Sequence, residues 1–173
     1  TKEQYLLLLN TYKPVCHFSI ERCGQNAKGQ YLNARGDDIR EFTAPLDELF
    51  KLGSKSAPSF GVGDGGNEVG MGSFADILKD KELFYDYCVI ACDYAMIASV
   101  SNWGGYGFLA ELERVTRIEV LPEFSAVETY LEFIVSKGSV DGIKRESVMS
   151  VDCKDWVIEP QILSALKAFA TKG

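Results

Sequence analysis

The sequence predicts an α/β fold in which a largely parallel sheet is flanked by helices, as in Rossmann-like proteins. Two observations support this prediction. Short apolar segments with the composition of strands alternate along the chain with segments of helical periodicity. Glycine-rich stretches follow two of the apolar segments, as they do where parallel strands end in ligand-binding loops. With 173 residues, of which 46% are hydrophobic, the chain is long enough for one domain with a sizeable core.

The first half of the chain begins with a predicted helix at residues 2–12 (KEQYLLLLNTY), and a buried strand is predicted at residues 14–20 (PVCHFSI). Residues 45–53 (PLDELFKLG) predict a short helix with a proline near its start and Gly53 beyond its end. Residues 59–63 (SFGVG) predict a strand that runs directly into a glycine-rich loop.

The second half is predicted to continue the alternation. Residues 87–100 are apolar enough for one or two strands, although their length also permits a buried helix. Residues 102–115 predict a helix in their second half, and residues 125–138 predict a helix with a capping box formed by Ser125 and Glu128.

The last helix is predicted to begin near Pro160, after a segment at residues 140–158 whose structure the pattern leaves open. Four apolar residues at helical spacing are expected to be buried on it: Ile162, Leu163, Leu166 and Phe169.

Composition excludes several classes of function. A net charge of -7 and a pI near 4.8 disfavour nucleic acid and anionic membranes as partners. No apolar run approaches the length of a membrane span, and no signal-peptide pattern opens the sequence. We therefore expect an intracellular protein, in the cytoplasm or, if the source is eukaryotic, in the mitochondrial matrix.

The cysteines and the single histidine indicate structural roles. Five cysteines are an odd number without a Cys-x-x-Cys pair, so we expect neither a disulfide framework nor a structural zinc site, and we expect most of them to be reduced core residues. His17 lies in an extended apolar stretch and is expected to be a structural histidine with its hydrogen bonds satisfied.

The stretch GVGDGGNEVGMG at residues 61–72 is the most unusual in the chain. Its first glycines have the Gly-x-Gly-x-x-Gly spacing that brings a backbone close to a dinucleotide pyrophosphate: Gly61, Gly63 and Gly66. Asp64 and Glu68 would repel such an anion. They suit a cation instead: an amino group, a divalent metal, or a proton in transit. The alternative is structural, with Asp64 and Asn67 capping turns or a helix while the glycines supply positive φ.

Two further stretches carry candidate binding residues. Ser101 and Asn102 follow an apolar segment and would lie at the carboxyl edge of a parallel sheet, where Asn102 could orient a carbonyl or carboxylate. Either residue could equally be an N-cap. Glu21, Arg22 and Arg35 follow the first strand, and arginine is suited to bind a substrate carboxylate. A solvated charged loop is the alternative.

The chain also resembles the carboxy-terminal domain of the D-glutamate cyclase family over roughly residues 14–143. The motifs that carry the resemblance occur in the family's order: IERCG, YLNARGDDI, PLDELF, GVGDGGNEVGMG, VSNWGGYGF and VDGI. The resemblance implies a single cyclase-like domain over residues 1–173 from which the amino-terminal part of the usual family domain is absent. An uncovered sheet edge or face would then favour a homodimer.

The resemblance implies a lyase that converts D-glutamate to 5-oxo-D-proline and water. Asp64 and Glu68 would then be the catalytic acid and base, or would hold a divalent metal, which is the one cofactor expected to be possible. The substrate would be bound by residues of all three stretches: Glu21, Arg22, Arg35, Gly65, Gly66, Asn67, Ser101 and Asn102. The alternatives are a noncatalytic module that binds an amino acid and a nucleotide-dependent oxidoreductase that uses the glycine loop.

Overall fold

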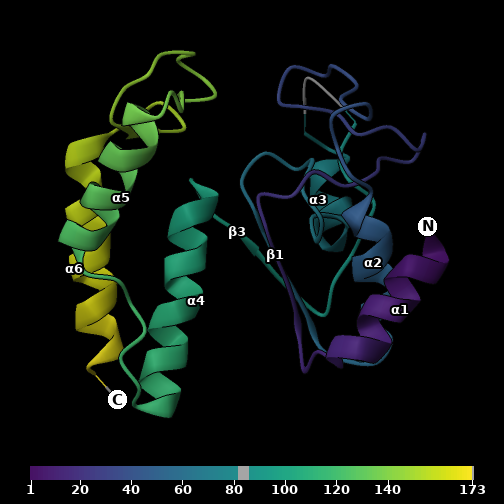
Figure 1. Cartoon of the computed structure of the whole chain (residues 1–173), viewed down its shortest axis with the longest axis horizontal. Coiled ribbons are helices and arrows are strands. Elements are labelled where there is room, and N and C mark those ends of the chain that lie inside the picture. The colour runs from purple at the N-terminus through teal and green to yellow at the C-terminus, as the bar shows by residue number, and fades with distance from the viewer. Residues whose placement is uncertain (82–85, 173) are drawn as a thin grey trace. The chain divides into compact units, whose positions relative to one another are not determined.

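A computed structural model of the chain describes residues 1–81 and 86–172 and confirms the α/β prediction. The chain divides into two compact units, Thr1–Gly104 and Gly105–Gly173. The first unit contains the parallel sheet, and the second consists mainly of helices (Figure 1). Among the described residues, no helix is both long and apolar enough to cross a bilayer.

Three parallel strands form the sheet of the first unit: β1 (His17–Ile20), β2 (Ser59–Gly63) and β3 (Tyr94–Ile97), in the order β1-β2-β3. Strand β3 accounts for only part of residues 87–100, the segment for which one or two strands or a helix were expected. Because all three strands run in the same direction, their carboxyl ends meet at one edge of the sheet, where α/β proteins bind ligands.

Helices α1 (Lys2–Tyr12) and α2 (Leu46–Gly53) lie side by side in the first unit (Figure 1). Thr1 and Gln4 form a capping box at the start of α1, so the hydrogen-bonding groups at this terminus are satisfied. Gly53 is the last residue of α2 and not the residue beyond it, a shift of one position from the prediction. The 3₁₀ turn η1 (Gly72–Phe74) and the short α3 (Ala75–Leu78) follow the glycine loop.

The glycine loop packs directly against β2. A Cβ atom on Gly61 would lie 2.7 Å from the Cα of Gly70, and one on Gly70 would lie 2.8 Å from the Cα of Gly61. Gly70 also has a φ of +103°, which favours glycine. These two glycines therefore permit a backbone contact that no other residue type could make without displacing the loop.

The second unit contains α5 (Phe124–Ser136) and α6 (Glu159–Ala170), together with most of α4 (Ser101–Thr116). Its core is formed by buried residues from α4, α6 and the α4–α5 connection: Ala110, Leu121, Leu163 and Ala170. The segment at 140–158 forms a small antiparallel pair, β4 (Ser150–Val151) with β5 (Lys154–Asp155), followed by the turn η2 (Trp156–Ile158).

Helix α4 is helical throughout, whereas the sequence predicted a helix only in its second half. The reason is the close contact of its first turn with the sheet, since a Cβ on Gly104 would lie 2.5 Å from Cγ1 of Val62. A glycine that lowers helix propensity is thus required by packing.

Two predictions for the other helices are wrong. Ser125 lies inside α5, whose N-cap is Glu123 without a side-chain hydrogen bond, and Glu128 accepts from Nε1 of Trp156 at 3.4 Å. Phe169 is 44% exposed, although Leu163 on the same helix is buried as expected.

Asp141 organises the loop between α5 and β4. Its Oδ1 accepts from the amides of Ile143 and Lys144 at 2.9 Å each, and its Oδ2 accepts from Oγ of Ser150 at 2.6 Å and from the amide of Cys153 at 2.9 Å. Burial acts to raise the pKa of Asp141, but these hydrogen bonds outweigh it and lower the pKa from its ordinary 3.8 to about 2.

We predict that Asp141→Asn lowers the free energy of unfolding by roughly 1 to 2 kcal/mol at neutral pH, because an amide group in either orientation faces two donors. Since the folded-state pKa of Asp141 is depressed, its contribution is complete above pH 3.8 and is lost as the pH falls toward about 2. Urea unfolding at neutral and acidic pH measures the difference. Equal stability of both proteins at neutral pH would contradict the assigned role.

We also predict that Gly61→Ala lowers the free energy of unfolding by about 1 to 3 kcal/mol, because the added methyl group would overlap the backbone of Gly70. Gly142→Ala is the control, since a Cβ at Gly142 meets no atom within 4 Å. Urea unfolding of both variants tests this, and equal effects of the two substitutions would show that the loop does not need the close contact.

Candidate functional site

The glycine loop turns back beneath the carboxyl end of β2 and brings Glu68 against it. A Cβ on Gly63 would lie 2.7 Å from Oε2 of Glu68, and Gly66 has a φ of +99°. The amide of Val69 donates to the carbonyl of Arg22 at 2.7 Å, which ties the loop to the segment after β1. The glycines therefore position a buried carboxylate at the edge of the sheet.

Glu68 is 1% exposed, and backbone amides of its own loop surround its carboxylate. Its Oε1 accepts from the amides of Asp64 at 3.2 Å and Gly65 at 2.8 Å, and its Oε2 accepts from the amide of Gly66 at 2.7 Å. Burial raises the pKa of Glu68 above its ordinary 4.5, although the amide hydrogen bonds act to lower it.

These hydrogen bonds bear on the dinucleotide interpretation. In a phosphate-binding loop the amides point at the ligand, and a helix N-terminus follows directly. Here the amides of Gly65 and Gly66 donate to Glu68, and the 3₁₀ turn η1 follows the loop. A carboxylate of the protein occupies the position that a bound anion would take, so the loop does not favour a pyrophosphate.

Asp64 is half-buried and holds the start of α4. Its Oδ2 accepts from the amide of Ser101 at 2.9 Å and from Oγ of Ser101 at 3.2 Å. The structural alternative, in which Asp64 caps a helix, therefore describes part of its role. The same contacts fix the direction in which the carboxylate points. Ser101, which donates both hydrogen bonds, is fully buried.

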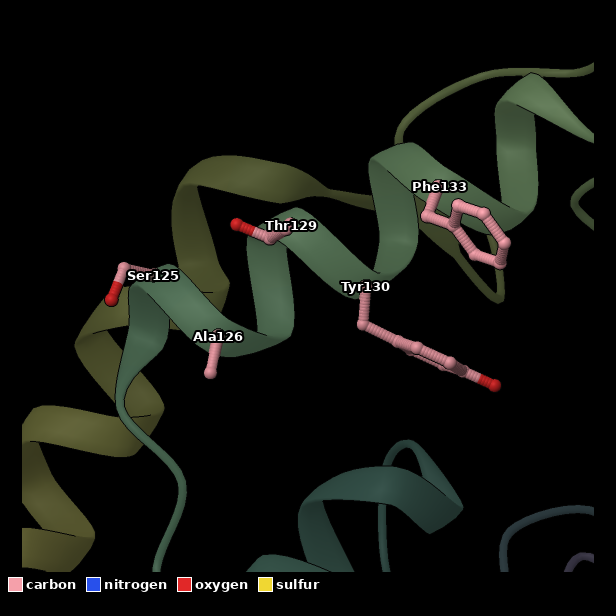
Figure 2. Close-up of a pocket in the computed structure, with 5 residues that line it drawn as sticks. All are labelled: Ser125, Ala126, Thr129, Tyr130 and Phe133. Carbon is pink, nitrogen blue, oxygen red and sulfur yellow. The ribbon is translucent and has the colours of Figure 1, made fainter.

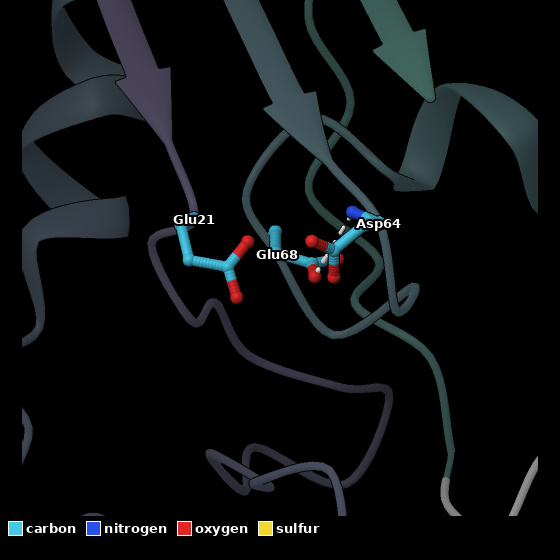
Figure 3. A group of neighbouring side chains, drawn as sticks. All are labelled: Glu21, Asp64 and Glu68. Carbon is cyan, nitrogen blue, oxygen red and sulfur yellow. Dashed lines mark hydrogen bonds between the residues drawn. The ribbon is translucent and has the colours of Figure 1, made fainter. Parts of the chain in front are cut away.

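Glu21 brings a third carboxylate to the same place (Figure 3). It follows β1 directly, has a φ of +54°, and donates its amide to the carbonyl of Val62 at 3.1 Å. Oxygen atoms of Glu21, Asp64 and Glu68 all lie within 4.8 Å of one another, and the three residues are exposed, half-buried and buried respectively.

This carboxylate cluster, defined as Glu21, Asp64 and Glu68, is suited to positive charge. Three carboxylates at such distances repel one another unless a cation or a proton is shared among them. An ammonium group, a divalent metal ion or a transferable proton would each relieve this repulsion. The raised pKa of Glu68 favours its protonated form.

The other predicted binding residues do not join the cluster in the described structure. Asn67 donates its side-chain amide to the carbonyl of Leu32 at 2.8 Å, and the amide of Arg35 donates to Oδ1 of Asn33 at 2.8 Å in an exposed turn. Asn102 is exposed on α4. Roles in substrate binding for these residues stay predictions.

Arg22 follows β1, as the sequence indicated, and its role in binding a substrate stays a prediction. Its Nη2 donates to the carbonyl of Ala44 at 2.5 Å, and it lines a cavity together with His17 and Ser19. Nε2 of His17 is buried and has no hydrogen-bond partner among the described residues, so the expectation of a satisfied histidine is wrong. Sequence reasoning missed this cavity because it depends on how α2 packs on β1.

A second hollow, of about 610 Å³, lies along one face of α5 and is lined by this helix alone (Figure 2). Its lining residues are Ser125, Ala126, Thr129, Tyr130 and Phe133. Tyr130 and Phe133 extend from the helix and are 65% and 57% exposed. No charged side chain is among these lining residues, and their polar groups are the hydroxyls of Ser125, Thr129 and Tyr130.

The cysteines are all free, as expected. Cys88 is buried, and burial raises the pKa of its thiol to about 12. Burial also raises the pKa values of Cys23 and Cys92. Because the thiolate is the nucleophile, these three residues are not poised for covalent catalysis. Cys16 and Cys153 are exposed and do not belong to the core.

Comparisons with known proteins point to one family. The model of a family described as D-glutamate cyclase-like, C-terminal, matches residues 3–167. Human mitochondrial D-glutamate cyclase is 44% identical over 99 residues, which make up 54% of this chain and 16% of that protein. The chain therefore corresponds to a small part of this relative's length.

We predict that Glu68 makes the stability of the protein depend on pH. The folded-state pKa of Glu68 is raised, so the free energy of unfolding should fall as the pH rises from 4.5 through that pKa. In Glu68→Gln this decline should disappear, whereas Glu41→Gln, which removes an exposed carboxylate, should keep it. Urea unfolding across this pH range is the measurement. Parallel profiles for the wild type and Glu68→Gln would show that Glu68 ionises as easily as it does in water.

Proposed function

Since the chain belongs to the D-glutamate cyclase-like, C-terminal family, we propose that it is a lyase that converts D-glutamate to 5-oxo-D-proline and water. The observation that carries the proposal is the carboxylate cluster at the carboxyl edge of the sheet, where three acidic side chains in different environments converge. The human relative named as a D-glutamate cyclase supports the choice of reaction.

The reaction needs a group that removes a proton and a group that donates one. The α-ammonium of the substrate must lose a proton before its nitrogen can attack the side-chain carboxyl. A new C–N bond then forms and the nitrogen loses a second proton. The C–O bond breaks, and the departing oxygen, which has taken up two protons in all, leaves as water. Holding the substrate folded makes the attack intramolecular. Good orientation of this kind can lower the barrier by about 7 kcal/mol or more.

The environments of the carboxylates suggest the two roles. Asp64 is the base in this proposal, because it is partly exposed and Ser101 fixes its orientation. Glu68 is the acid, because its raised pKa favours the protonated form. Glu21 is the exposed member and attracts the substrate ammonium.

Substrate binding draws on the remaining predicted residues. Arg22 is the arginine nearest in sequence to the cluster and would pair with a substrate carboxylate, while Arg35 and Asn102 would approach from exposed segments. The amides of Gly65 and Gly66 could stabilise an oxyanion only if they released Glu68, since both donate to it. Asn67 supports the loop through Leu32.

A divalent metal is a second occupant for the same cluster. Carboxylate oxygens are the ligands that Mg²⁺ and Mn²⁺ prefer, and Asp64 and Glu68 would hold the ion with Glu21. Calorimetric titration with MgCl₂ and MnCl₂, and activity before and after treatment with a chelator, separate this arrangement from direct binding of the ammonium.

The decisive experiment incubates the chain with D-glutamate and, separately, L-glutamate, and follows 5-oxoproline by mass spectrometry. Formation of 5-oxo-D-proline faster than in buffer supports the proposal. Binding of D-glutamate without turnover would instead support the noncatalytic module, and equilibrium binding of NAD(H) would support the oxidoreductase.

We predict that Asp64→Asn and Glu68→Gln each lower turnover of D-glutamate by about 10² to 10⁴-fold, the range usual for loss of a general acid or base. The folded state should persist in both variants, as judged by circular dichroism. Asp76→Asn is the control, because it removes an exposed carboxylate that pairs with Lys79 in a surface salt bridge of little energetic weight. Wild-type turnover in both cluster variants would remove the cluster from the mechanism.

A further inference from the structure

A cavity of about 310 Å³ lies between β1 and α2 in the first unit. Both polar and apolar side chains line its wall. Strand β1 contributes His17, Phe18, Ser19 and Ile20, the turn that follows contributes Arg22, and α2 contributes Leu46, Leu49 and Phe50. Because a water molecule takes up about 30 Å³ in the liquid and ligand pockets begin near about 300 Å³, the cavity is large enough for a small organic molecule.

Three of the side chains that line this cavity each contain a buried polar atom without a hydrogen-bond partner in the described part of the chain. These atoms are Nε2 of His17, Oγ of Ser19 and Nε of Arg22. Within residues 1–81 and 86–172, no other buried side-chain nitrogen or oxygen was found without a partner. Ser19 as a whole is only 8% exposed. Buried polar groups are nearly always paired with protein, ligand or ordered water, so three unpaired atoms in side chains around one cavity mark it as a place where a ligand could pair with them.

The surrounding structure holds these side chains in place. The ring of His17 packs edge-on against Phe50, with ring centroids 6.4 Å apart, and a Cβ on Gly53 would lie 2.1 Å from that ring. The guanidinium of Arg22 is anchored through Nη2 to the carbonyl of Ala44. The polar atoms are therefore positioned before any ligand arrives, which reduces the entropy lost on binding.

The donors define the class of ligand. Nε of Arg22 is a cationic donor, the Ser19 hydroxyl can donate, and Nε2 of His17 can donate or accept. A carboxylate accepts such hydrogen bonds with both oxygens, and a charged acceptor makes the stronger ones. The leucine and phenylalanine side chains of α2 suit a compact hydrocarbon body.

We propose that this cavity binds small organic acids, with the carboxylate on Arg22 and Ser19 and the hydrocarbon against α2. The carboxylate cluster is not part of this cavity, because Glu21, Asp64 and Glu68 are not among its lining residues. Arg22 is the residue that the cavity shares with the proposed binding of the substrate, so an acid in the cavity would compete with the substrate carboxylate for it. It adjoins the cluster through Val69, which lines the cavity and donates its amide to the carbonyl of Arg22.

Two probes of matched shape test the charge requirement: cyclopentanecarboxylate and its neutral amide, cyclopentanecarboxamide. Titration of each into the protein is followed by backbone-amide NMR. The carboxylate should shift the amides of residues 17–22 and 46–50 and should bind at least roughly tenfold more tightly than the carboxamide, as expected for charged hydrogen bonds. The readout is binding, so a chain without cyclase activity gives the same answer.

A pair of matched serines tests the site itself. Ser19→Ala should weaken binding of cyclopentanecarboxylate about tenfold, while the ligand-free protein melts at the same or a higher temperature because an unpaired buried hydroxyl has been removed. Ser59, which is 1% exposed on β2, bonds through Oγ to Oδ2 of Asp93 at 2.7 Å. Ser59→Ala should therefore lower the melting temperature and leave the affinity unchanged.

Several results would overturn the proposal. Absence of shifts at residues 17–22, or equal affinity for the carboxylate and the carboxamide, would show that no carboxylate site exists there. Shifts centred on Gly65 and Glu68 would place the ligand in the carboxylate cluster instead. Unchanged affinity in Ser19→Ala, with the protein folded, would also reject the site.

Discussion

The close contact between β2 and the glycine loop is the constraint on which the candidate site depends. Gly61 and Gly70 meet backbone to backbone, and any side chain at either position would force the two segments apart. Only with the loop at this distance can Glu68 reach beneath Gly63 and accept the amides of its own loop. The glycines are thus needed less for flexibility than for close approach. Glu68 can reach its position because the glycines have no side chains that would block it.

Burial of Glu68 sets the chemistry of the cluster. Three amide hydrogen bonds favour the carboxylate, yet desolvation outweighs them and the pKa is raised. Asp141 shows the opposite balance, because four hydrogen bonds outweigh its burial and lower its pKa to about 2. The comparison shows that the balance between desolvation and hydrogen bonding decides the sign. Desolvation prevails at Glu68, which therefore retains a tendency to hold its proton beside Asp64.

Hydrophobic periodicity and turn signals predicted most elements of the fold, whereas a short capping motif and the features that depend on tertiary contacts were predicted poorly. Helix α1 and strand β2 have the predicted bounds, since periodicity and local turn signals determine them. The capping box at Ser125 failed because the same residue types also occur inside helices. The sequence identified Asp64 and Glu68 as a candidate pair but could not show that Glu68 accepts hydrogen bonds from the glycine amides. The same glycine spacing allows the loop amides to bind either an external anion or a carboxylate of the protein. The unpaired atoms of His17 and Ser19 depend on α2, which follows much later in the chain, so no local signal could reveal them.

The turn after β1 connects the cluster and the cavity. Glu21 adopts a left-handed φ of +54°, which costs a residue other than glycine roughly 1 kcal/mol or more. In return, consecutive residues serve different places: the carboxylate of Glu21 joins Asp64 and Glu68, while the guanidinium of Arg22 lines the cavity. A regular extension of the strand would also point the two side chains apart, but it would carry Arg22 away from the carbonyl of Ala44 and from the amide of Val69. The strained turn therefore places an anionic and a cationic side chain on either side of one short backbone segment, so that each can serve its own site.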